Sequence, residues 1–542
     1  MVWKLAVTVL LLGLGIAYMS GLFRSPPDPP EVGDGWWGRG DKPKKEEDTS
    51  VKRFNIRFPD ADLADLKERL RRTRWFESVE GTKFHFGIKP EYMKKIVDYW
   101  LNKYDWRKKE QELNQYQSYK TKIEGIDIHF VRAVPRLKVG QKAKPILMVH
   151  GWPSSFYEFY KIIPMLIDPT RHGGTEDDIF EVIVPSLPGY GFSEAAHKQG
   201  MGRFQSTARW RKKEQELNQY QSYKTKIEGI DIHFVRAVPR LNVGQKAKPI
   251  LMVHGWPSSF YEFYKIIPML IDPTRHGGTE DDIFEVIVPS LPGYGFSEAA
   301  HKQGFDSYYV QGGDWGAKVT DQMAGMFPNH VRGIHVNMIL VQPPVSQIIL
   351  GSLFPSLVLE NKGYARSLPS WESLKFWLME TGYLHIQATK PDTVGHALTD
   401  SPVGLAAYII EKFSSWTNYD WLDLDDGGLD AYWSKDDLLT NVMIYWVSEC
   451  ITSSMRLYKE NLPVSRSLSN FLNTVPAGLA DLPNDLSRAQ KNWATQHYTD
   501  IVSYTTYSTG GHFAAFEVPD QLAKDLRQFV QKVEQRLLNN LT

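Results

Sequence analysis

The chain has 542 residues, of which 42% are hydrophobic, and its 63 basic and 63 acidic residues give a net charge of zero. This length suffices for one large α/β domain with an accessory region, and the neutral balance gives no reason to expect a nucleic-acid partner. The single cysteine, Cys450, excludes an intramolecular disulfide framework and argues against a secreted, oxidised fold. No C-x-x-C or H-E-x-x-H pattern occurs, so neither a metal site nor a cofactor is predicted.

The N-terminus begins with an almost unbroken apolar stretch, Leu5–Phe23, between Lys4 and Arg24. About twenty such residues can cross a bilayer as a helix. A cleavable signal peptide is the alternative, but the apolar run is long for one and no A-x-A site follows it. We therefore predict an uncleaved single-pass membrane anchor over residues 1–24, whose orientation the flanking charges leave open.

The next part of the chain alternates helical and strand-like stretches. Helices are predicted over Asp60–Thr73 and Pro90–Tyr104, and Thr121–Val134 alternates like a β-hairpin. Pro145–Val149 and Ile179–Val184 are continuous apolar runs, which are typical of strands buried on both faces of a parallel sheet. Together these stretches predict an α/β fold in which helices cover a parallel sheet.

The chain then repeats itself. Trp106–Gly200 recurs as Trp210–Gly304 with one difference, Lys138 against Asn242. This is either a tandem duplication or an error of sequence assembly, and the sequence does not decide between them. Parallel strands need a crossover of about a dozen residues, and only the first copy is followed by a candidate helix, Met201–Arg209. We predict that the first copy builds the sheet and that the second is extruded from the core.

A catalytic turn is predicted at Gly312-Gly313-Asp314-Trp315-Gly316, between the apolar run Tyr308–Val310 and a helix over Ala317–Phe327. A strand, a glycine-flanked turn and a helix form a nucleophile elbow, which lifts the central side chain above the sheet edge. That residue is Asp314, whose carboxylate, with a pKa of about 4, is ionised without help from a base. A carboxylate at this position favours attack on a saturated, polarised carbon. A glycine-rich turn with a helix-capping aspartate is the alternative.

After this elbow, Val331–Met338 is predicted as the next core strand. Residues 340–466 are aromatic-rich and mostly helical in pattern, and they interrupt the order of strands, so we predict that they form a lid. Phe471–Ala477 and Ile501–Tyr507 are predicted as two further strands. The chain closes with an amphipathic helix predicted over Pro519–Leu538.

Two further residues fit a catalytic role by their order in the chain. His512 follows the last predicted strand, and Asp485 follows a preceding one. The order nucleophile, acid, histidine, each after a strand, is that of an α/β-hydrolase, in which the acid orients the histidine as a base. A structural histidine and a turn or helix-capping aspartate are the alternatives.

Several motifs match a known family. Besides the apolar N-terminal segment they are Gly35-Trp36-Trp37-Gly38, His150-Gly151-Trp152-Pro153-Ser154-Ser155-Phe156-Tyr157-Glu158-Phe159-Tyr160, Gly312–Gly316, Gly382-Tyr383-Leu384-His385-Ile386-Gln387, Tyr458-Lys459-Glu460-Asn461 and Gly510-Gly511-His512-Phe513-Ala514-Ala515-Phe516-Glu517. On these motifs the chain resembles the microsomal epoxide hydrolases, most closely the insect juvenile-hormone epoxide hydrolases, over nearly all of its length outside the repeat.

The resemblance implies a role for each candidate residue. Asp314 would be the nucleophile and His512 the base that accepts a proton from water. Tyr383 and Tyr458 would be the lid residues that donate protons to the epoxide oxygen. Asp485 would orient His512, at a position where the family usually has Glu.

The resemblance also implies an oxyanion hole and a setting for the reaction. The backbone N–H groups of Trp315 and Trp152 would hold the oxyanion, or those of Trp315 and Trp256 if the second copy is used. The substrates would be lipophilic epoxides, with juvenile hormone and xenobiotic epoxides as candidates, and water. The protein would be a single-pass protein of the endoplasmic reticulum or microsomal membrane, in contact with lipid through its N-terminal helix, with a cytosolic catalytic domain.

The predicted architecture is an α/β-hydrolase fold with a helical lid, an N-terminal epoxide-hydrolase region and a single transmembrane helix. Its predicted parts are a membrane anchor (1–24), a linker (25–50), the N-terminal epoxide-hydrolase region (51–136), the first part of the core (137–209), the second copy of the repeat (210–304), the elbow and next strand (305–339), the lid (340–466) and the C-terminal part of the core (467–542).

Two alternative functions stay open. A haloalkane dehalogenase shares the aspartate, the histidine and the His-Gly-Trp-Pro turn, but it would need halide-binding tryptophan or asparagine in the lid. A catalytically impaired relative that only binds epoxides is the other alternative, because the repeat could disturb the fold.

Overall fold

The computed structural model describes residues 36–43, 47–198, 220–227, 230–241, 245–252, 266–277, 279, 283–289, 307–462 and 472–539. The chain forms two units, Met1–Gln205 with Ser307–Thr542, and Ser206–Asp306. The predicted anchor at 1–24 and the helix expected at Met201–Arg209 lie outside the described residues. Among the helices within the described ranges, none is long and apolar enough to cross a membrane.

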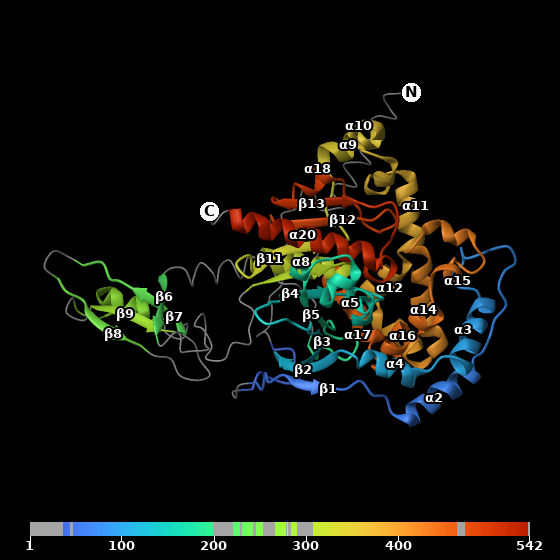
Figure 1. Ribbon diagram of the computed structural model, residues 1–542, viewed down its shortest axis with the longest axis horizontal. Helices are drawn as coiled ribbons and strands as arrows, with labels where there is room; N and C mark the ends of the chain where they lie inside the picture. The colour runs from blue at the N-terminus through green and yellow to red at the C-terminus, as the bar shows by residue number, and fades with distance from the viewer. Residues whose placement is uncertain are drawn as a thin grey trace. The chain divides into compact units, whose positions relative to one another are not determined.

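Within its described residues, the first unit is built around a nine-stranded sheet with the order β1-β2-β3-β5-β4-β10-β11-β12-β13 (Figure 1). The pairs from β1 to β5 are antiparallel, and those from β5 to β13 are parallel. The strands are Lys52–Phe54 (β1), Gln117–Ile123 (β2), Ile126–Ala133 (β3), Lys144–Val149 (β4), Phe180–Pro185 (β5), Tyr308–Gly312 (β10), Val331–Val336 (β11), Ala477–Asp481 (β12) and Ile501–Thr506 (β13). The predicted α/β class is confirmed.

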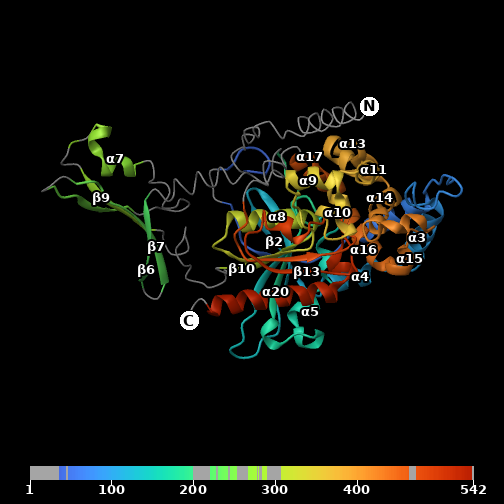
Figure 2. The ribbon, with the colours of Figure 1, turned by 90° about the horizontal axis from the view of Figure 1, so that it is seen from above.

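Helices cover both faces of this sheet. On one face α8 (Asp314–Met326) contacts β4, β10 and β11, while α20 (Pro519–Asn539) and α5 (Ile163–Ile167) lie on the other (Figure 2). The strands between these helices are apolar because both of their faces are covered; Tyr309 and Val310 of β10, for example, point to opposite faces and are both fully buried. The N-terminal region adds α2 (Asp60–Arg71), α3 (Pro90–Asn102) and α4 (Trp106–Leu113).

The segment predicted as a lid is helical in its described part, 340–462. Its helices are α9 (Val345–Leu353), α10 (Pro355–Val358), α11 (Trp371–Glu380), α12 (Gly382–Thr389), α13 (Pro391–Asp400), α14 (Pro402–Ser415), α15 (Leu429–Tyr432), α16 (Lys435–Val447) and α17 (Ile451–Asn461), with the 3-10 helices η7 (Lys362–Ser367) and η8 (Tyr419–Asp423). This segment connects β11 to β12, so it follows the carboxyl end of a core strand.

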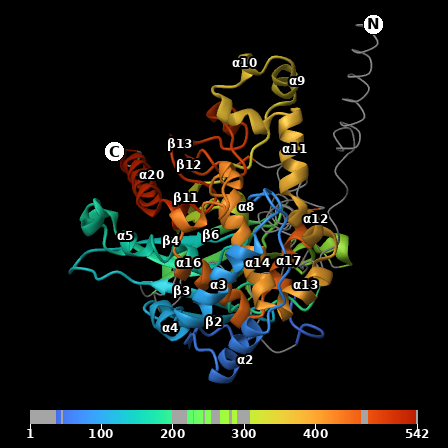
Figure 3. The same ribbon diagram turned by 90° about the vertical axis from the view of Figure 1, so that its right-hand side faces the viewer.

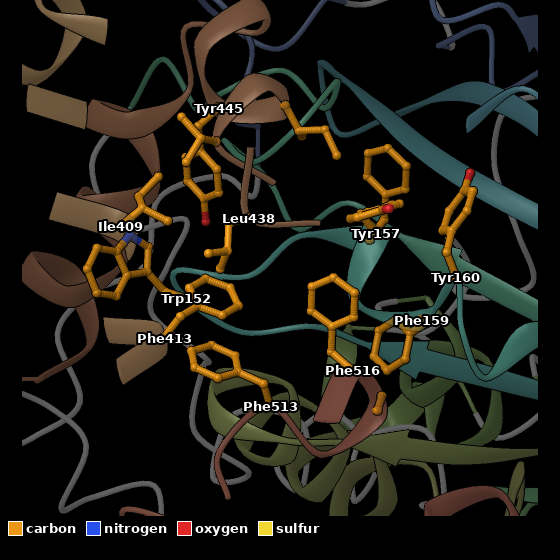
Figure 4. Close-up of a cluster of buried hydrophobic side chains, with 14 of the residues drawn as sticks. Trp152, Tyr157, Phe159, Tyr160, Ile409, Phe413, Leu438, Tyr445, Phe513 and Phe516 are labelled. Atoms are coloured by element: carbon orange, nitrogen blue, oxygen red, sulfur yellow. The ribbon is translucent and has the colours of Figure 1, made fainter. Parts of the chain in front are cut away.

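Aromatic side chains join the lid to the sheet. Phe413 of α14 stacks on Phe513, with 4.1 Å between the ring centroids, and Tyr445 of α16 donates a hydrogen bond to the carbonyl oxygen of Ser154 at 2.7 Å. Figure 4 shows these side chains in one buried cluster with Trp152, which has no exposed surface. Because this cluster holds residues that follow β4 and β13, it fixes the lid over the carboxyl edge of the sheet.

The two copies of the repeat form the same local structure in different sheets. In the first unit β4 pairs with β5 on one side and with the elbow strand β10 on the other, where Val149 lies opposite Gly312. The second copy forms a four-stranded sheet of its own, β6 (Gln221–Ile227), β7 (Ile230–Ala237), β9 (Phe284–Pro289) and β8 (Lys248–Leu251), in the order β6-β7-β9-β8. The strands beside the elbow therefore come from the first copy.

Two elements differ from the sequence prediction. The strand predicted over Phe471–Ala477 is wrong in its bounds, because β12 runs over Ala477–Asp481; Pro476, which has no N–H to donate, directly precedes it. Phe471 itself lies outside the described residues. The helix α4 was not predicted, and its start is explained by Asp105, whose side chain accepts a hydrogen bond from the N–H of Lys108 at 3.2 Å.

A matched pair of substitutions distinguishes the copies. Val182 in β5 and Val286 in β9 are equivalent positions, and both are fully buried. Val182→Asp should unfold the nine-stranded sheet, because a carboxylate without a partner costs several kcal/mol in a core, on the order of 4 or more. Hydrogen exchange of β10, followed by mass spectrometry, should then lose its protection, whereas Val286→Asp should leave β10 protected. Loss of protection in both variants, or only with Val286→Asp, would contradict this assignment of the copies.

Candidate active site

The turn between β10 and α8 places Asp314 at the carboxyl edge of the sheet. Its φ is +49°, in the left-handed region that costs a non-glycine residue energy and is concentrated at functional sites. The flanking glycines are needed because a Cβ on Gly312 would overlap the backbone of Gly316, and one on Gly316 would overlap the carbonyl oxygen of Val149. The sequence therefore folds here as the predicted elbow, with α8 held against the end of β4.

The two carboxylate oxygens of Asp314 have different surroundings. Oδ1 accepts a hydrogen bond from the backbone N–H of Trp152 at 2.8 Å. Oδ2 lies 3.3 Å from Nε2 of His512, an ion-pair distance at which the hydrogen-bond geometry is not met. Gly151 makes this approach possible, since a Cβ there would overlap the carboxylate. One oxygen is thus fixed, and the other faces the histidine.

His512 and Asp485 form a buried pair. Nδ1 of His512 lies 2.9 Å from Oδ1 of Asp485, which also accepts the N–H of Leu486 at 2.6 Å. Burial alone would lower the pKa of His512, but the carboxylates of Asp314 and Asp485 outweigh it and raise this pKa to about 10. Burial raises the pKa of Asp485 as well. Near neutral pH the imidazole is therefore a cation between two carboxylates, oriented by Asp485.

Tyr383 and Tyr458 bring two hydroxyl groups from the lid to the same place. Tyr383 lies in the first turn of α12 and Tyr458 lies in α17, and their rings meet edge to face with 5.9 Å between the centroids. Burial, followed by the charge of Asp314, raises the pKa of both far above the usual value for tyrosine. Both hydroxyls therefore stay protonated and act as neutral hydrogen-bond donors.

The tryptophan of the His-Gly-Trp-Pro turn is the centre of an aromatic cage. The Trp152 ring stacks on Tyr383 at 5.3 Å and meets Tyr458 edge-on at 5.9 Å, while Trp315 packs edge-on against Tyr458 at 5.1 Å. The structure thus brings together all the predicted site residues except Trp256, which lies outside the described residues.

Two buried glutamates beside His512 were missed by the sequence analysis. Burial raises the pKa of Glu158 to about 7 and that of Glu517 to about 8, so Glu517 is mainly a neutral acid at neutral pH. Both lie inside the recognised motifs, and for Glu158 the available signal was its position within the aromatic run Phe156–Tyr160.

Glu517 supports the loop that carries His512. Its Oε1 accepts the N–H of Phe513 at 2.8 Å. On the other side, the N–H of His512 donates to the carbonyl oxygen of Trp416 at 3.1 Å. The peptide groups on both sides of the histidine are therefore held, and the imidazole is positioned before any substrate binds.

The arrangement can carry out a two-step substitution. An ionised carboxylate can attack an electrophilic carbon to form an ester, and a histidine oriented by an acid can activate the water that hydrolyses it. Among the described residues, no group of three or more histidine, cysteine, aspartate or glutamate side chains is arranged to hold a metal ion.

Known proteins similar to this chain include epoxide hydrolases. Residues 51–159 and 181–263 match the family model described as epoxide hydrolase N terminus, and residues 248–447 match that of the alpha/beta hydrolase fold. Epoxide hydrolase 1 of Sus scrofa is 40% identical over 512 residues, which cover 93% of this chain and 94% of that protein. Juvenile hormone epoxide hydrolase 1 of Ctenocephalides felis is 36% identical over 537 residues, covering 98% and 96%. The crystal structure of juvenile hormone epoxide hydrolase from the silkworm Bombyx mori superimposes with a TM-score of 0.68 at 33% identity, covering 92% of this chain and 98% of that one.

Removal of the Glu517 acceptor should separate the two steps of the substitution. Glu517→Ala should slow hydrolysis of the Asp314 ester by roughly fivefold, because a hydrogen bond of about 1 kcal/mol no longer holds the His512 loop. Formation of the ester, which does not use His512 as a base, should change much less. Glu517→Gln keeps an acceptor oxygen and should restore most of the hydrolysis rate. Equal losses in both steps, measured by rapid-quench kinetics, would point to general destabilisation instead.

Proposed function

The chain belongs to the microsomal epoxide hydrolase family, and from this premise we propose that it converts lipophilic epoxides to vicinal diols through a covalent ester on Asp314. The observation that carries the proposal is the arrangement around this carboxylate. One oxygen is held by the Trp152 N–H, the other faces His512, and two tyrosine hydroxyls lie in the lid above. Each group needed to open an epoxide and to hydrolyse the resulting ester is present.

In the first step Oδ2 of Asp314 attacks one carbon of the epoxide ring. A bond forms between this oxygen and the carbon, and the ring C–O bond breaks with its electron pair left on the epoxide oxygen. Tyr383 and Tyr458 hydrogen-bond to that oxygen, and one of them transfers its proton to it. Because an unassisted alkoxide is a poor leaving group, the tyrosines lower the barrier where the negative charge develops.

Ester formation changes the charge that His512 experiences. The Asp314 carboxylate is one of the two groups that raise the histidine pKa, and it becomes neutral when it is alkylated. The pKa of His512 then falls, and its proton replaces the one that the tyrosine has lost. Alkylation therefore converts the imidazolium into the neutral base that the second step requires.

In the second step His512 takes a proton from a water molecule, whose oxygen attacks Cγ of the ester. The developing charge falls on Oδ1, which is already bound to the N–H of Trp152; the N–H of Trp315 is the second donor in this proposal. The tetrahedral intermediate collapses and the bond between Cγ and Oδ2 breaks, so that Oδ2 leaves as one oxygen of the diol and the imidazolium gives its proton to it. The oxygen from water stays on Cγ. The regenerated carboxyl group loses its proton to His512, which restores the starting ion pair.

The relatives named above suggest the class of substrate. Two of them are named for juvenile hormone and one is epoxide hydrolase 1, so bulky lipophilic epoxides, including juvenile hormone and xenobiotic epoxides, are the substrates in this proposal. The apolar stretch Leu5–Phe23 supports a single-pass membrane anchor. The endoplasmic reticulum membrane, with the catalytic domain on the cytosolic side, is the location that the resemblance to microsomal epoxide hydrolases suggests. An enzyme anchored in a membrane would meet such substrates in the bilayer, into which they partition.

Substitution of the nucleophile and of the base should stop the reaction at different points. Asp314→Asn should lower diol formation on the order of 10⁴-fold or more, because a neutral amide is not a nucleophile. His512→Gln should still form the ester and accumulate it, which intact-protein mass spectrometry detects as a stoichiometric adduct. The control is His335→Gln, since His335 pairs with Asp525 at 3.0 Å in a buried site of its own and should not trap the ester. A folded His512→Gln protein that forms no adduct would refute these roles.

The lid tyrosines should act together in ring opening. Tyr383→Phe and Tyr458→Phe should each slow ester formation by roughly tenfold, and the double variant by on the order of 10²-fold or more, because either hydroxyl alone still assists the developing alkoxide. Single-turnover kinetics measure this step. Tyr445→Phe is the control, since its hydroxyl donates to the carbonyl oxygen of Ser154. An unchanged alkylation rate in the double variant would remove both tyrosines from the mechanism.

A further inference from the structure

Two indole N–H groups beside the active site lack a hydrogen-bond acceptor. They are Nε1 of Trp152 and Nε1 of Trp416, and within the described part of the chain neither atom has a partner. The two side chains are 0% and 1% exposed, so bulk water does not reach them. A buried donor without an acceptor is costly, because the hydrogen bond that it makes with water in the unfolded chain is not replaced. We therefore expect a ligand or an ordered water to accept these hydrogen bonds.

Elsewhere in the core the fold supplies an acceptor for a buried indole. Nε1 of Trp433 donates to the carbonyl oxygen of Phe413 at 2.9 Å, and Nε1 of Trp106 donates to Oε1 of Glu110 at 2.7 Å. Among the described residues, Trp100 in α3 is the other tryptophan whose Nε1 is buried without a partner. Two unpartnered indoles in contact with each other are thus a particular feature of the active site.

Both of these indoles contact the ring of Tyr383. The centroid of the Tyr383 ring lies 5.3 Å from that of Trp152, on which it stacks, and 4.9 Å from that of Trp416. The two indoles contact each other at 6.0 Å, with an angle of 62° between their planes. Tyr383 supplies one of the hydroxyls that bind the epoxide oxygen in the proposed reaction. Both N–H groups therefore lie beside the place where the epoxide ring opens.

One N–H group comes from the sheet and the other from the lid. Trp152 lies in the turn after β4, whereas Trp416 directly follows α14 and keeps helical dihedral angles. Ile409 and Trp416 are seven residues apart, which is about two helical turns, so they share one face of α14. Figure 4 shows the indole nitrogen of Trp152 on the side of Ile409, and Figures 1 and 3 show α14 close to α12 and α17, which carry the two tyrosines. The nitrogen of Trp152 is thus directed at the helix face that carries Trp416.

We propose that Nε1 of Trp152 and Nε1 of Trp416 bind a neutral acceptor oxygen of the substrate, such as an ether or carbonyl oxygen near the epoxide ring. We call this pair of donors the acceptor subsite. A purely hydrocarbon epoxide leaves both donors without a partner, whereas an acceptor oxygen restores the hydrogen bond. A site that binds a substrate oxygen in this way discriminates against an analogue that lacks it. The inference rests on the proposed epoxide hydrolysis and names a narrower class of substrate for it.

The charges beside the acceptor subsite favour a neutral ligand over an anion. Asp314 and Asp485 carry two negative charges against the one positive charge of His512. Nζ of Lys412 lies 5.7 Å from the centroid of the lid indole, but it is paired with Glu411 at 2.5 Å. The excess negative charge opposes a halide ion, which is the ligand expected for the dehalogenase alternative, and it does not oppose a neutral oxygen.

Calorimetric binding of two diols tests the proposal without turnover. Phenoxypropanediol and phenylbutanediol, each with vicinal hydroxyls at one end, are the products expected from the matching epoxides, and they differ only by an ether oxygen in place of a methylene group. The full-length chain should bind the ether diol with a Kd roughly fivefold lower, because one further hydrogen bond forms. Equal Kd values, or tighter binding of the more hydrophobic diol, would overturn the proposal. Diol formation from propylene oxide by the same preparation reports separately on the proposed reaction.

Trp416→Phe assigns the effect to the lid indole. The substitution keeps an aromatic ring against Tyr383 and removes the N–H group, so the ratio of the two Kd values should fall from roughly fivefold to roughly twofold or less. The ratio is the readout because a general loss of packing weakens the binding of both diols alike. Trp100→Phe is the matched control, since Nε1 of Trp100 is also buried and unpartnered in a side chain that is 3% exposed, and it should leave the ratio unchanged. An unchanged ratio in Trp416→Phe would mean that another group binds the ether oxygen, and the assignment would be wrong.

Two further measurements complete the test. If Trp416→Phe does not fold, Trp152→Phe provides the same comparison, because it removes the other N–H group. Chloride is the probe for an anion: if sodium chloride, but not sodium gluconate, competes with both diols, the indoles bind a halide and the proposal fails. Absence of this competition, together with tighter binding of the ether diol, supports a neutral acceptor.

Discussion

The close approach of α8 to the end of β4 is the constraint on which the site depends. A side chain at Gly316 would overlap the carbonyl oxygen of Val149, so only glycine lets the helix come this near. The approach sets the N–H of Trp152 against Oδ1 of Asp314, and it holds Asp314 at a positive φ. The strand β11 lies on one side of β10, so only one other strand can pair with β10 on its opposite side. A chain with two nearly identical copies of that strand must therefore use one for the site, and here it is the first.

The same approach gathers a dense set of buried ionisable groups. Asp314 and Asp485 flank His512, so two carboxylates share one imidazolium, and a further negative charge would be costly at such a depth. Glu158 and Glu517 avoid this cost because burial raises their pKa values toward the neutral form. In this way the carboxyl group of Glu517 can hold the histidine loop without competing for its proton.

Features that depend on residues close together in the chain could be predicted from the sequence, whereas features that depend on contacts between distant residues could not. The elbow could be predicted because its glycines and Asp314 are neighbours in the chain, and the apolar runs of β4 and β5 were recognisable because both faces of each strand are covered. The bounds of β12 were misjudged, since apolar residues before Pro476 resemble a strand although the chain pairs only after it. Glu517 was missed because its function depends on the burial of a short helix against the lid, a contact that no local pattern records.

The lid shows that one pattern can have two physical meanings. Ile409 and Phe413 of α14 are spaced four residues apart and lie in the buried cluster of Figure 4, whereas Ile349 and Leu353 of α9 have the same spacing and face outwards. The neighbours of each helix decide the difference: aromatic residues of the His512 loop cover α14, and polar contacts through Gln490 hold the α9–α10 segment by its inner side. Burial of α14 stabilises the catalytic arrangement, while exposure of α9 costs stability in water.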